Sequence, residues 1–556
     1  MKTKNLLRNV GLGMAVLTPF VHTDAKNRTQ KPNVVFILAD DLGWSDLQCY
    51  GSTFYETPNL NKLAEEGVRF TDAYAACHVS SPSRASILTG QYPARTHLSD
   101  WLPGRKDFPF QKLKNAVPVP HLPYGENNTF PTVLQANGYE TAIIGKWHLG
   151  EDSLTTERQG FKYHTPSGYL KGWPATGYFP PYNMPGLTDG PEGEYLTDRL
   201  TDEALKFITE NKDKPFLLYL SHYAVHDPIQ GRPDLVKKYE EKLAKMEKPE
   251  GLPFILEGNP DDKNPISRAD LDYMIKNDEF QGFKVFSNRT VKIKQFQDNV
   301  QFAAMVESVD ESVGRIITKL KELGLDQNTI VIFYSDNGGM SAANFGNPGR
   351  VVPEERLDQS FSSSNLPLRG AKGFLYEGGI RVPLIVKWPQ HGKINTISSI
   401  PVISVDFYPT LLEMTGINTK KLNHIMDGQS IVPLLLTKNK KETDIASRPI
   451  FWHFPHYSNH GMQSPGGAIR LGDYKLLDYF ENNSVQLFNL KNDPGEQNDL
   501  SKQMPEKVNE LKALLDQWRK DVKADMMDPN PDYNPDVIPT DFNTRKMQVK
   551  MEGTFL

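Results

Sequence analysis

The sequence has 556 residues, 38% hydrophobic and 24% charged, an ordinary globular composition that is long enough for two domains. Its formal net charge is -5, so the chain has no overall basic character and nucleic acid is not an expected partner. Cys49 and Cys77 are the two cysteines in the sequence. This number excludes a disulfide-based fold and leaves either one bridge or two free thiols.

The N-terminus has the pattern of an export signal. Lys2, Lys4 and Arg8 precede an apolar stretch over residues 10–21, and small residues follow where cleavage would occur. The stretch is short for a membrane span, and a buried core helix is the alternative interpretation. We therefore expect a signal peptide over residues 1–25 and an exported protein, periplasmic or secreted, with no integral membrane segment.

The first folded element is predicted at residues 33–39, an unbroken apolar run typical of a strand buried on both faces. It ends in Asp40 and Asp41, whose carboxylates would repel each other unless a cation lay between them. Hard oxygen ligands favour calcium or magnesium. The simpler alternative is a pair of aspartates that only caps a loop.

Strand and helix signals alternate along the first half of the chain. Strands are predicted at residues 68–73, 140–144 and 216–220, and helices begin near residues 57 and 129. This alternation predicts a mostly parallel sheet covered by helices. Binding sites in such sheets gather at the carboxyl ends of the strands. Lys146 and His148 follow one of these strands, and His226 follows another.

A second pair of oxygen ligands occurs later. A long amphipathic helix is predicted at residues 296–323, followed by a strand over residues 329–334 that ends in Asp336 and Asn337. Two such pairs strengthen the case for a metal site. Farther on, glycines flank Lys372, so the backbone can bend around a ligand and the ammonium group can meet an anion. A flexible surface lysine is the alternative.

The chain becomes polar and charged near residues 438–447, where we place a domain junction. Short strand signals follow at residues 450–454, 467–471, 474–477 and 485–488, and then an amphipathic helix at residues 505–522. We therefore expect a catalytic α/β domain over residues 26–440 and a smaller antiparallel sheet with one helix within residues 441–556. The tail after residue 525 is rich in Pro, Asp and Asn, so it either wraps the surface or is mobile.

Residues 80–84 read Ser-Ser-Pro-Ser-Arg and lead into a small-residue helix that ends in Thr89 and Gly90. Together with the aspartates, lysines and histidines named above, in this order, they make the chain resemble the formylglycine-dependent sulfatases from about residue 33 to residue 500. The resemblance implies an alkaline-phosphatase-like fold. It also implies that Ser80 is oxidised to formylglycine, as in serine-type bacterial members, by a radical S-adenosylmethionine maturing enzyme. The spacing of Cys77 to Pro82 and Arg84 does not fit that pattern.

The resemblance also implies a role for each site residue. One calcium ion would be held by Asp40, Asp41, Ser80, Asp336 and Asn337. Arg84 would fix the hydrated aldehyde, and the sulfate oxygens would be bound by Lys146, His226 and Lys372. His226 or Lys372 is the expected proton donor to the leaving alcohol, and His148 the expected acceptor when sulfate departs. Such a cluster supplies the charge neutralisation and the proton that cleavage of a sulfate ester requires.

Aromatic and cationic residues lie in variable stretches that could face the leaving group, and they suit a sulfated sugar. The predicted contacts are Trp101, Arg105, His453 and His456. We expect a sulfuric ester hydrolase that acts from the chain end on galactose or N-acetylgalactosamine sulfate. Two alternatives stay open: a phosphoester or phosphonate hydrolase of the same superfamily, and an unmatured protein that binds sulfated glycans.

Overall fold

The computed structural model describes residues 31–125, 127–150, 155–167, 169, 171–277, 289–344, 352–436 and 442–537. The predicted signal peptide lies outside the described residues, as does part of the predicted domain junction. Within these ranges, no helix is both long and apolar enough to cross a membrane. Cys49 is partly buried and Cys77 is buried, and both are free thiols.

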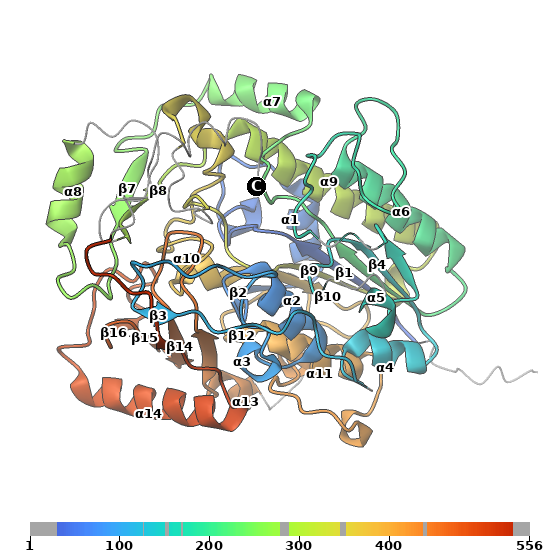
Figure 1. Ribbon diagram of the computed structural model, residues 1–556. Helices are drawn as coiled ribbons and strands as arrows, with labels where there is room; N and C mark the ends of the chain where they lie inside the picture. The colour runs from blue at the N-terminus through green and yellow to red at the C-terminus, as the bar shows by residue number, and fades with distance from the viewer. Residues whose placement is uncertain are drawn as a thin grey trace, which may run out of the picture.

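A nine-stranded sheet forms the centre of the larger part of the described chain (Figure 1). The strand order is β11-β2-β10-β9-β1-β6-β4-β5, and β12 pairs with β2. Neighbouring strands are parallel except at β10, which runs antiparallel to β2 and β9. The strands are β1 (Asn33–Ala39), β2 (Val68–Tyr74), β4 (Glu140–Gly145), β5 (Tyr163–Thr165), β6 (Phe216–Ser221), β9 (Thr329–Ser335), β10 (Arg381–Lys387), β11 (Thr396–Ser398) and β12 (Val402–Ile403).

Helices cover both faces of this sheet (Figure 1). One face is covered by α1 (Pro58–Glu65), α6 (Leu196–Glu210), α7 (Pro233–Leu243) and α9 (Val300–Glu322). The other is covered by α2 (Ser80–Thr89), α4 (Phe130–Ala136), α11 (Phe407–Met414) and α12 (Val432–Leu435). This is the mostly parallel, helix-flanked sheet that the sequence predicts.

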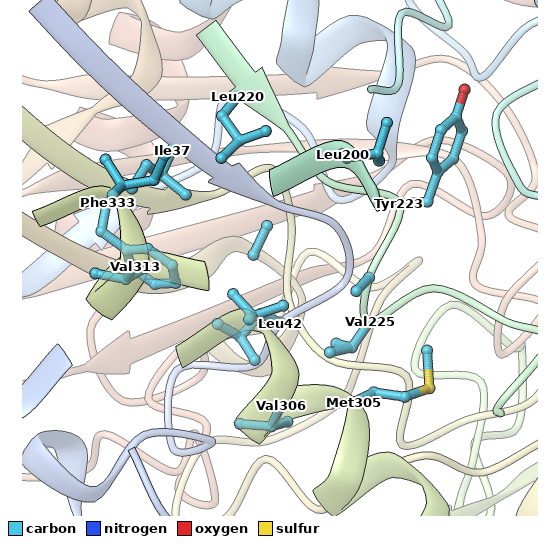
Figure 2. Close-up of a cluster of buried hydrophobic side chains, with 14 of the residues drawn as sticks. Ile37, Leu42, Leu200, Leu220, Tyr223, Val225, Met305, Val306, Val313 and Phe333 are labelled. Atoms are coloured by element: carbon cyan, nitrogen blue, oxygen red, sulfur yellow. The ribbon is translucent and has the colours of Figure 1, made fainter. Parts of the chain in front are cut away.

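The sheet separates two apolar cores because successive strand residues point to opposite faces. In β1, Ile37 belongs to the core on the α9 side and Phe36 to the core on the α2 side. Figure 2 shows the first of these cores, where Ile37 and Phe333 of adjacent strands lie next to Val313 of α9. Burial on both faces explains why the β1 sequence is apolar without alternation.

The C-terminal part has its own sheet, which is antiparallel in the order β13-β14-β15-β16 (Figure 1). Its strands are β13 (Ile450–Phe454), β14 (Gly466–Leu471), β15 (Tyr474–Tyr479) and β16 (Val485–Asn489). The helix α14 (Pro505–Val522) packs on β14 and β15 through Leu511 and Leu515. The predicted small sheet with one helix is therefore confirmed, with strand ends differing by at most two residues.

Two elements differ from the sequence-based expectation. The long helix α9 begins at Val300 instead of residue 296, because the Asn299 side chain accepts a hydrogen bond from the Phe302 amide and caps the helix there. The strand β10 was not predicted, since Pro383 lies in its middle. The register with β2 shifts between Val382 and Leu384, so a bulge accommodates the proline.

The remaining elements are short. The strands β7 (Phe254–Glu257) and β8 (Val291–Lys294) form an antiparallel pair, and α8 (Arg268–Lys276), which lies between them in the sequence, packs against β7. In the C-terminal tail, β17 (Asp528–Pro529) pairs with β3 (Leu113–Lys114) and thereby returns the chain to the N-terminal part. The other short helices are α3 (Pro93–Thr96), α5 (Thr155–Arg158), α10 (Glu377–Ile380) and α13 (Glu442–Ala446).

Candidate active site

Four oxygen-bearing side chains meet at one edge of the main sheet. The strands β1 and β9 are parallel neighbours with Ala39 opposite Ser335, so the residues that follow them emerge side by side. Asp41 has a φ of 62°, a left-handed conformation that ends the strict in-and-out alternation of the strand. As a result, carboxylate oxygens of Asp40, Asp41 and Asp336 lie within 4.8 Å of one another, and all three residues are buried. Asn337 joins them by donating to Asp41 Oδ1 at 2.7 Å.

This donor set fits a hard divalent cation. Three buried carboxylates and one amide offer oxygen atoms without any imidazole or thiolate, as calcium and magnesium prefer. Buried carboxylates at this distance need compensating positive charge. Burial opposes ionisation of Asp40, but Lys146, His226 and Arg84 together hold the pKa of this carboxyl below its ordinary value.

Ser80 lies at the first position of α2 and faces the acidic cluster. Its hydroxyl donates to Asp40 Oδ1 at 3.2 Å and lies 3.4 Å from Asn337 Oδ1, while Lys146 Nζ donates to the same hydroxyl at 3.0 Å. The residue is 3% exposed, and every residue of α2 is buried. The side chain of residue 80 is therefore held between a candidate metal site and an ammonium group.

Arg84 lies one turn farther along α2, on the same face as Ser80. Its Nε donates to Asp336 Oδ2 at 2.8 Å, and its Nη1 donates to Ser221 Oγ at 2.6 Å. Burial disfavours its charge, but Asp336 and Asp40 raise the pKa of the guanidinium above its ordinary value. Arg84 therefore connects the helix that carries Ser80 to the strand ends at β6 and β9.

Two lysines bring positive charge from different loops. Lys146 follows β4 and donates to both carboxylate oxygens of Asp40, at 2.7 and 2.9 Å. Burial lowers its pKa, and Asp40 opposes the shift. Lys372 donates to Asp41 Oδ2 at 2.8 Å, and although burial opposes it, Asp41 raises the pKa of this lysine. The amide of Gly373 donates to the His78 carbonyl at 3.1 Å, which fixes the Lys372 loop beside the Ser80 turn.

The pKa values of the two predicted histidines are shifted in opposite directions. His226 Nε2 lies 3.6 Å from Asp41 Oδ2, and its Nδ1 lies 2.8 Å from Asp227 Oδ1. Burial and Lys372 oppose protonation, but Asp41 and Asp227 raise the pKa of His226. His148 Nε2 donates to the Leu102 carbonyl at 2.9 Å, and burial followed by Lys146 holds its pKa well below the ordinary value. His148 is thus neutral, with Nδ1 as the acceptor atom.

Comparison with known families decides the class. The model of the family described as Sulfatase matches residues 32–417. The chain belongs to the sulfatase family. A second model, described as the C-terminal region of N-sulphoglucosamine sulphohydrolase, matches residues 371–521. The predicted resemblance is confirmed, and with it the alkaline-phosphatase-like fold and the class of sulfuric ester hydrolases.

Individual relatives cover most of this sulfatase. A sulfatase of Formosa agariphila is 30% identical over 86% of the chain and 86% of the relative. An N-acetylglucosamine-6-O-sulfatase of Bacteroides thetaiotaomicron is 27% identical over 92% of the chain and 90% of the relative. The crystal structure of Ps i-CgsB in complex with k-i-k-neocarrahexaose is 26% identical, has a TM-score of 0.63 and covers 94% of this chain and 97% of that chain.

The structure brings most of the predicted site residues of this sulfatase together. The four oxygen ligands, Ser80, Arg84, Lys146, His226 and Lys372 are linked by the contacts above, and His148 lies close enough to Lys146 and Arg84 for both to lower its pKa. Ser221 and Asp227 belong to the same cluster but were not predicted. Ser221 is the last residue of β6 and Asp227 lies beyond the end of that strand, at the same sheet edge as His226, and this position was the available signal.

The four predicted sugar contacts differ in what they contact within the protein. Trp101 is partly buried and packs against Cys77 and Val79, directly before the Ser80 turn. Arg105 donates to the Ser458 carbonyl at 3.1 Å. His453 and His456 are buried, and their Nε2 atoms already bond within the protein: the first to the Asp525 carbonyl at 2.7 Å, the second to Ser99 Oγ at 3.0 Å.

Proposed function

We propose that this protein is an exported sulfatase that removes sulfate esters from glycans, acting from the chain end on galactose or N-acetylgalactosamine sulfate. Membership of the sulfatase family supports the reaction class. The names of two similar proteins, an N-acetylglucosamine-6-O-sulfatase and a protein crystallised with a neocarrahexaose, support a sulfated carbohydrate as substrate. The export signal in the sequence supports a periplasmic or secreted location.

The observation that carries the proposal is the position of residue 80. Its side chain lies between the Asp40 carboxylate and the Lys146 ammonium, where a nucleophile would meet both metal and sulfate. We propose that a radical S-adenosylmethionine enzyme oxidises Ser80 to formylglycine. After hydration, residue 80 offers one hydroxyl to attack sulfur and a second whose deprotonation re-forms the aldehyde as sulfate leaves. An unmodified serine would instead be left as a stable sulfate ester.

We further propose calcium as the metal, held by Asp40, Asp41, Asp336, Asn337 and the side chain of residue 80. When bound, the ion supplies positive charge that orients the nucleophile and stabilises the sulfate oxygens. The carboxylates lie close enough together for one shared cation. The absence of imidazole from this donor set favours a one-metal sulfatase site over the histidine-containing two-zinc sites of related phosphatases.

The remaining steps belong to the protein's own side chains. Lys146 and Lys372 bind the sulfate oxygens, and Arg84 orients residue 80 through its position on the same helix face. Against burial and Lys372, Asp41 and Asp227 raise the pKa of His226, which favours its protonated form and suits it to give a proton to the leaving alcohol; Lys372 is the other candidate donor. His148 is neutral, so its Nδ1 can accept the proton released when sulfate departs.

Peptide mass and sulfate release test this proposal together. The protein is expressed in an anaerobic bacterial host with a maturing enzyme, and the tryptic peptide of residues 70–84 is weighed. A mass lower by two hydrogens at Ser80 is expected. The Ser80→Ala variant is the control, because its peptide has no hydroxyl at residue 80 to oxidise. Matured protein is then incubated with 6-sulfated galactose, N-acetylgalactosamine and N-acetylglucosamine, and free sulfate is measured. Full conversion without sulfate release from any of these sugars would refute the 6-sulfated monosaccharides as substrates, whereas a persistently unmodified Ser80 would favour a glycan-binding protein.

A further inference from the structure

A loop of the C-terminal part reaches the Lys372 loop at close range. It follows β13 and spans residues 455–465, with His460 near its tip. Gly373 has a φ of +88°, and a Cβ atom added there would lie 2.4 Å from Ser458 Oγ and 2.5 Å from His460 Cβ. Because Gly373 has no side chain, His460 can pack directly against the backbone next to Lys372.

Hydrogen bonds hold this loop in place from several sides. Arg105 Nη1 donates to the Ser458 carbonyl at 3.1 Å, and the Leu375 amide donates to Gln463 Oε1 at 2.6 Å. Within the loop, the His460 amide donates to Ser458 Oγ at 3.2 Å. The position of His460 is thus set by the segments that carry Arg105 and Lys372, before any ligand binds.

The imidazole of His460 is buried but makes no hydrogen bond within the described part of the chain. The residue is 5% exposed, and in the part of the chain that the structure describes neither Nδ1 nor Nε2 has a hydrogen-bond partner. Buried polar atoms without partners are uncommon in native proteins and call for an explanation such as a ligand. His453 and His456, from the same region, differ because the Nε2 atom of each is bonded within the protein.

The surroundings of His460 are those of the active site. After burial, the groups that act on its charge are Lys372, Asp227, His226 and His78, and the net effect lowers its pKa well below the ordinary value. The ring is therefore neutral and presents one N–H donor and one acceptor nitrogen. A sulfate group only accepts hydrogen bonds, and in the proposed function Lys146 and Lys372 bind it. A sugar hydroxyl both donates and accepts, so it matches a neutral imidazole better.

We propose that His460 is a specificity-determining residue that hydrogen-bonds to a hydroxyl of the sugar bearing the sulfate. This assignment rests on the proposed function, because it requires a sulfated sugar in the site. The sequence favoured His453 and His456 as sugar contacts. The structure instead favours His460, because neither of its ring nitrogens has a hydrogen-bond partner among the described residues. The C-terminal part would then supply substrate selection, while the main sheet supplies the chemistry.

The test compares two substrates with matured enzyme. One is whichever 6-sulfated sugar the wild type cleaves best, and the other is 4-nitrophenyl sulfate, which has a sulfate ester but no sugar hydroxyls. His460→Phe keeps a ring and removes both nitrogens. We expect kcat/KM to fall about tenfold to a hundredfold for the sugar. For the aryl sulfate, kcat/KM should stay within about threefold of the wild type. His460→Gln retains a donor and an acceptor, so it should recover part of the sugar activity.

His78→Phe is the matched control. His78 is also a buried histidine without partners for either ring nitrogen among the described residues, and it lies close enough to His460 to lower the pKa of that residue. Burial and its own backbone act on the pKa of His78, so this variant tests whether the loss of any buried imidazole from the region changes the selectivity. Its replacement should leave the ratio of sugar to aryl sulfate activity unchanged.

Three outcomes would overturn the inference. An equal loss of kcat/KM for both substrates in both His460 variants would show that His460 acts in the sulfate pocket or stabilises the fold. Melting temperatures would distinguish these two roles. An unchanged sugar kcat/KM in His460→Phe would show that the ring does not contact the sugar. If fully matured wild type cleaves the aryl sulfate but no sugar, the proposed function fails first, and the assignment of His460 fails with it.

Discussion

Gly172→Ala is a sharp test of the role assigned to His148. The imidazole of His148 is held between the Leu102 carbonyl, which accepts from Nε2 at 2.9 Å, and the backbone of Gly172. A Cβ atom at residue 172 would lie 2.2 Å from Cε1, 2.3 Å from Nδ1 and 2.7 Å from Cγ of that ring. Non-bonded carbon atoms prefer a separation of about 3.5–4.0 Å. The ring or the backbone must therefore move by about 1 Å or more.

A displacement of this size is large for a proton acceptor. Misplacing a catalytic group by about 1 Å can cost about a hundredfold in rate. In the proposed mechanism His148 acts only when sulfate departs, so the loss should fall on the second half of the turnover. We expect kcat to drop about a hundredfold while the first release of alcohol stays nearly as fast as in the wild type. Alcohol should therefore appear in a burst equal to the enzyme concentration.

Rapid mixing with 4-nitrophenyl sulfate measures both phases, because nitrophenol reports the first half of the turnover. Gly258→Ala serves as the control, since a Cβ there would meet only Leu271, at 3.4 Å from Cδ1 and 3.9 Å from Cδ2, which are ordinary contacts. If Gly172→Ala slows the first turnover as much as the steady state, His148 does not act in sulfate release alone. A wild-type kcat would show that the ring relaxes without consequence and would refute the positional argument.

Three further predictions concern the charged groups of the site. Lys372→Ala and His226→Ala should each abolish measurable sulfate release while the calcium-saturated protein keeps its melting temperature; a large loss of stability with proportionate residual activity would contradict this. Asp336→Ala should lower calcium affinity and stability together, by up to about 3–5 kcal/mol for stability, because the buried Arg84 loses its shorter carboxylate contact and keeps only Asp40, at 3.4 Å. An unchanged calcium-dependent rise in melting temperature would place the metal elsewhere. Although burial and Lys372 oppose it, Asp41 raises the pKa of His226. The donor proton is therefore lost only as pH rises through that raised value, and kcat/KM should decline only above the ordinary value of about 6.5. A decline that begins below this pH would exclude His226 as the donor.

Much of the fold follows from local sequence. The apolar run of β1 predicts a strand buried on both faces, and its end predicts where Asp40 and Asp41 lie. The same rule applied to β9 brings Asp336 and Asn337 beside them, since parallel neighbours end at one edge. The helical spacing of apolar residues in α9 and α14 is equally informative.

Other features depend on contacts between distant segments and escaped prediction for that reason. The proline inside β10 argues against a strand in the sequence, but a bulge in the pairing with β2 allows the sheet to accommodate it. His453, His456 and His460 are chemically identical in the sequence, and only their positions in the fold reveal which one lacks an internal partner. Likewise, nothing near Gly172 in the sequence indicates that its backbone lies against His148.

The charges of the site also predict how metal and substrate depend on each other. Four carboxylates face three lysine and arginine side chains and one histidine there: Asp40, Asp41, Asp227 and Asp336 against Arg84, Lys146, Lys372 and His226. The residues alone are therefore close to neutral, and a calcium ion would leave a net positive charge in a buried place, where an anion is needed to offset it. A sulfate ester supplies that anion. Sulfated galactose should thus bind the unmatured protein at least about tenfold more tightly with calcium than with a chelator, as measured by calorimetry. Equal affinity with calcium and with the chelator would show that the lysines bind sulfate without help from a metal. The buried carboxylates would then be compensated only by their ion pairs with the lysines and Arg84.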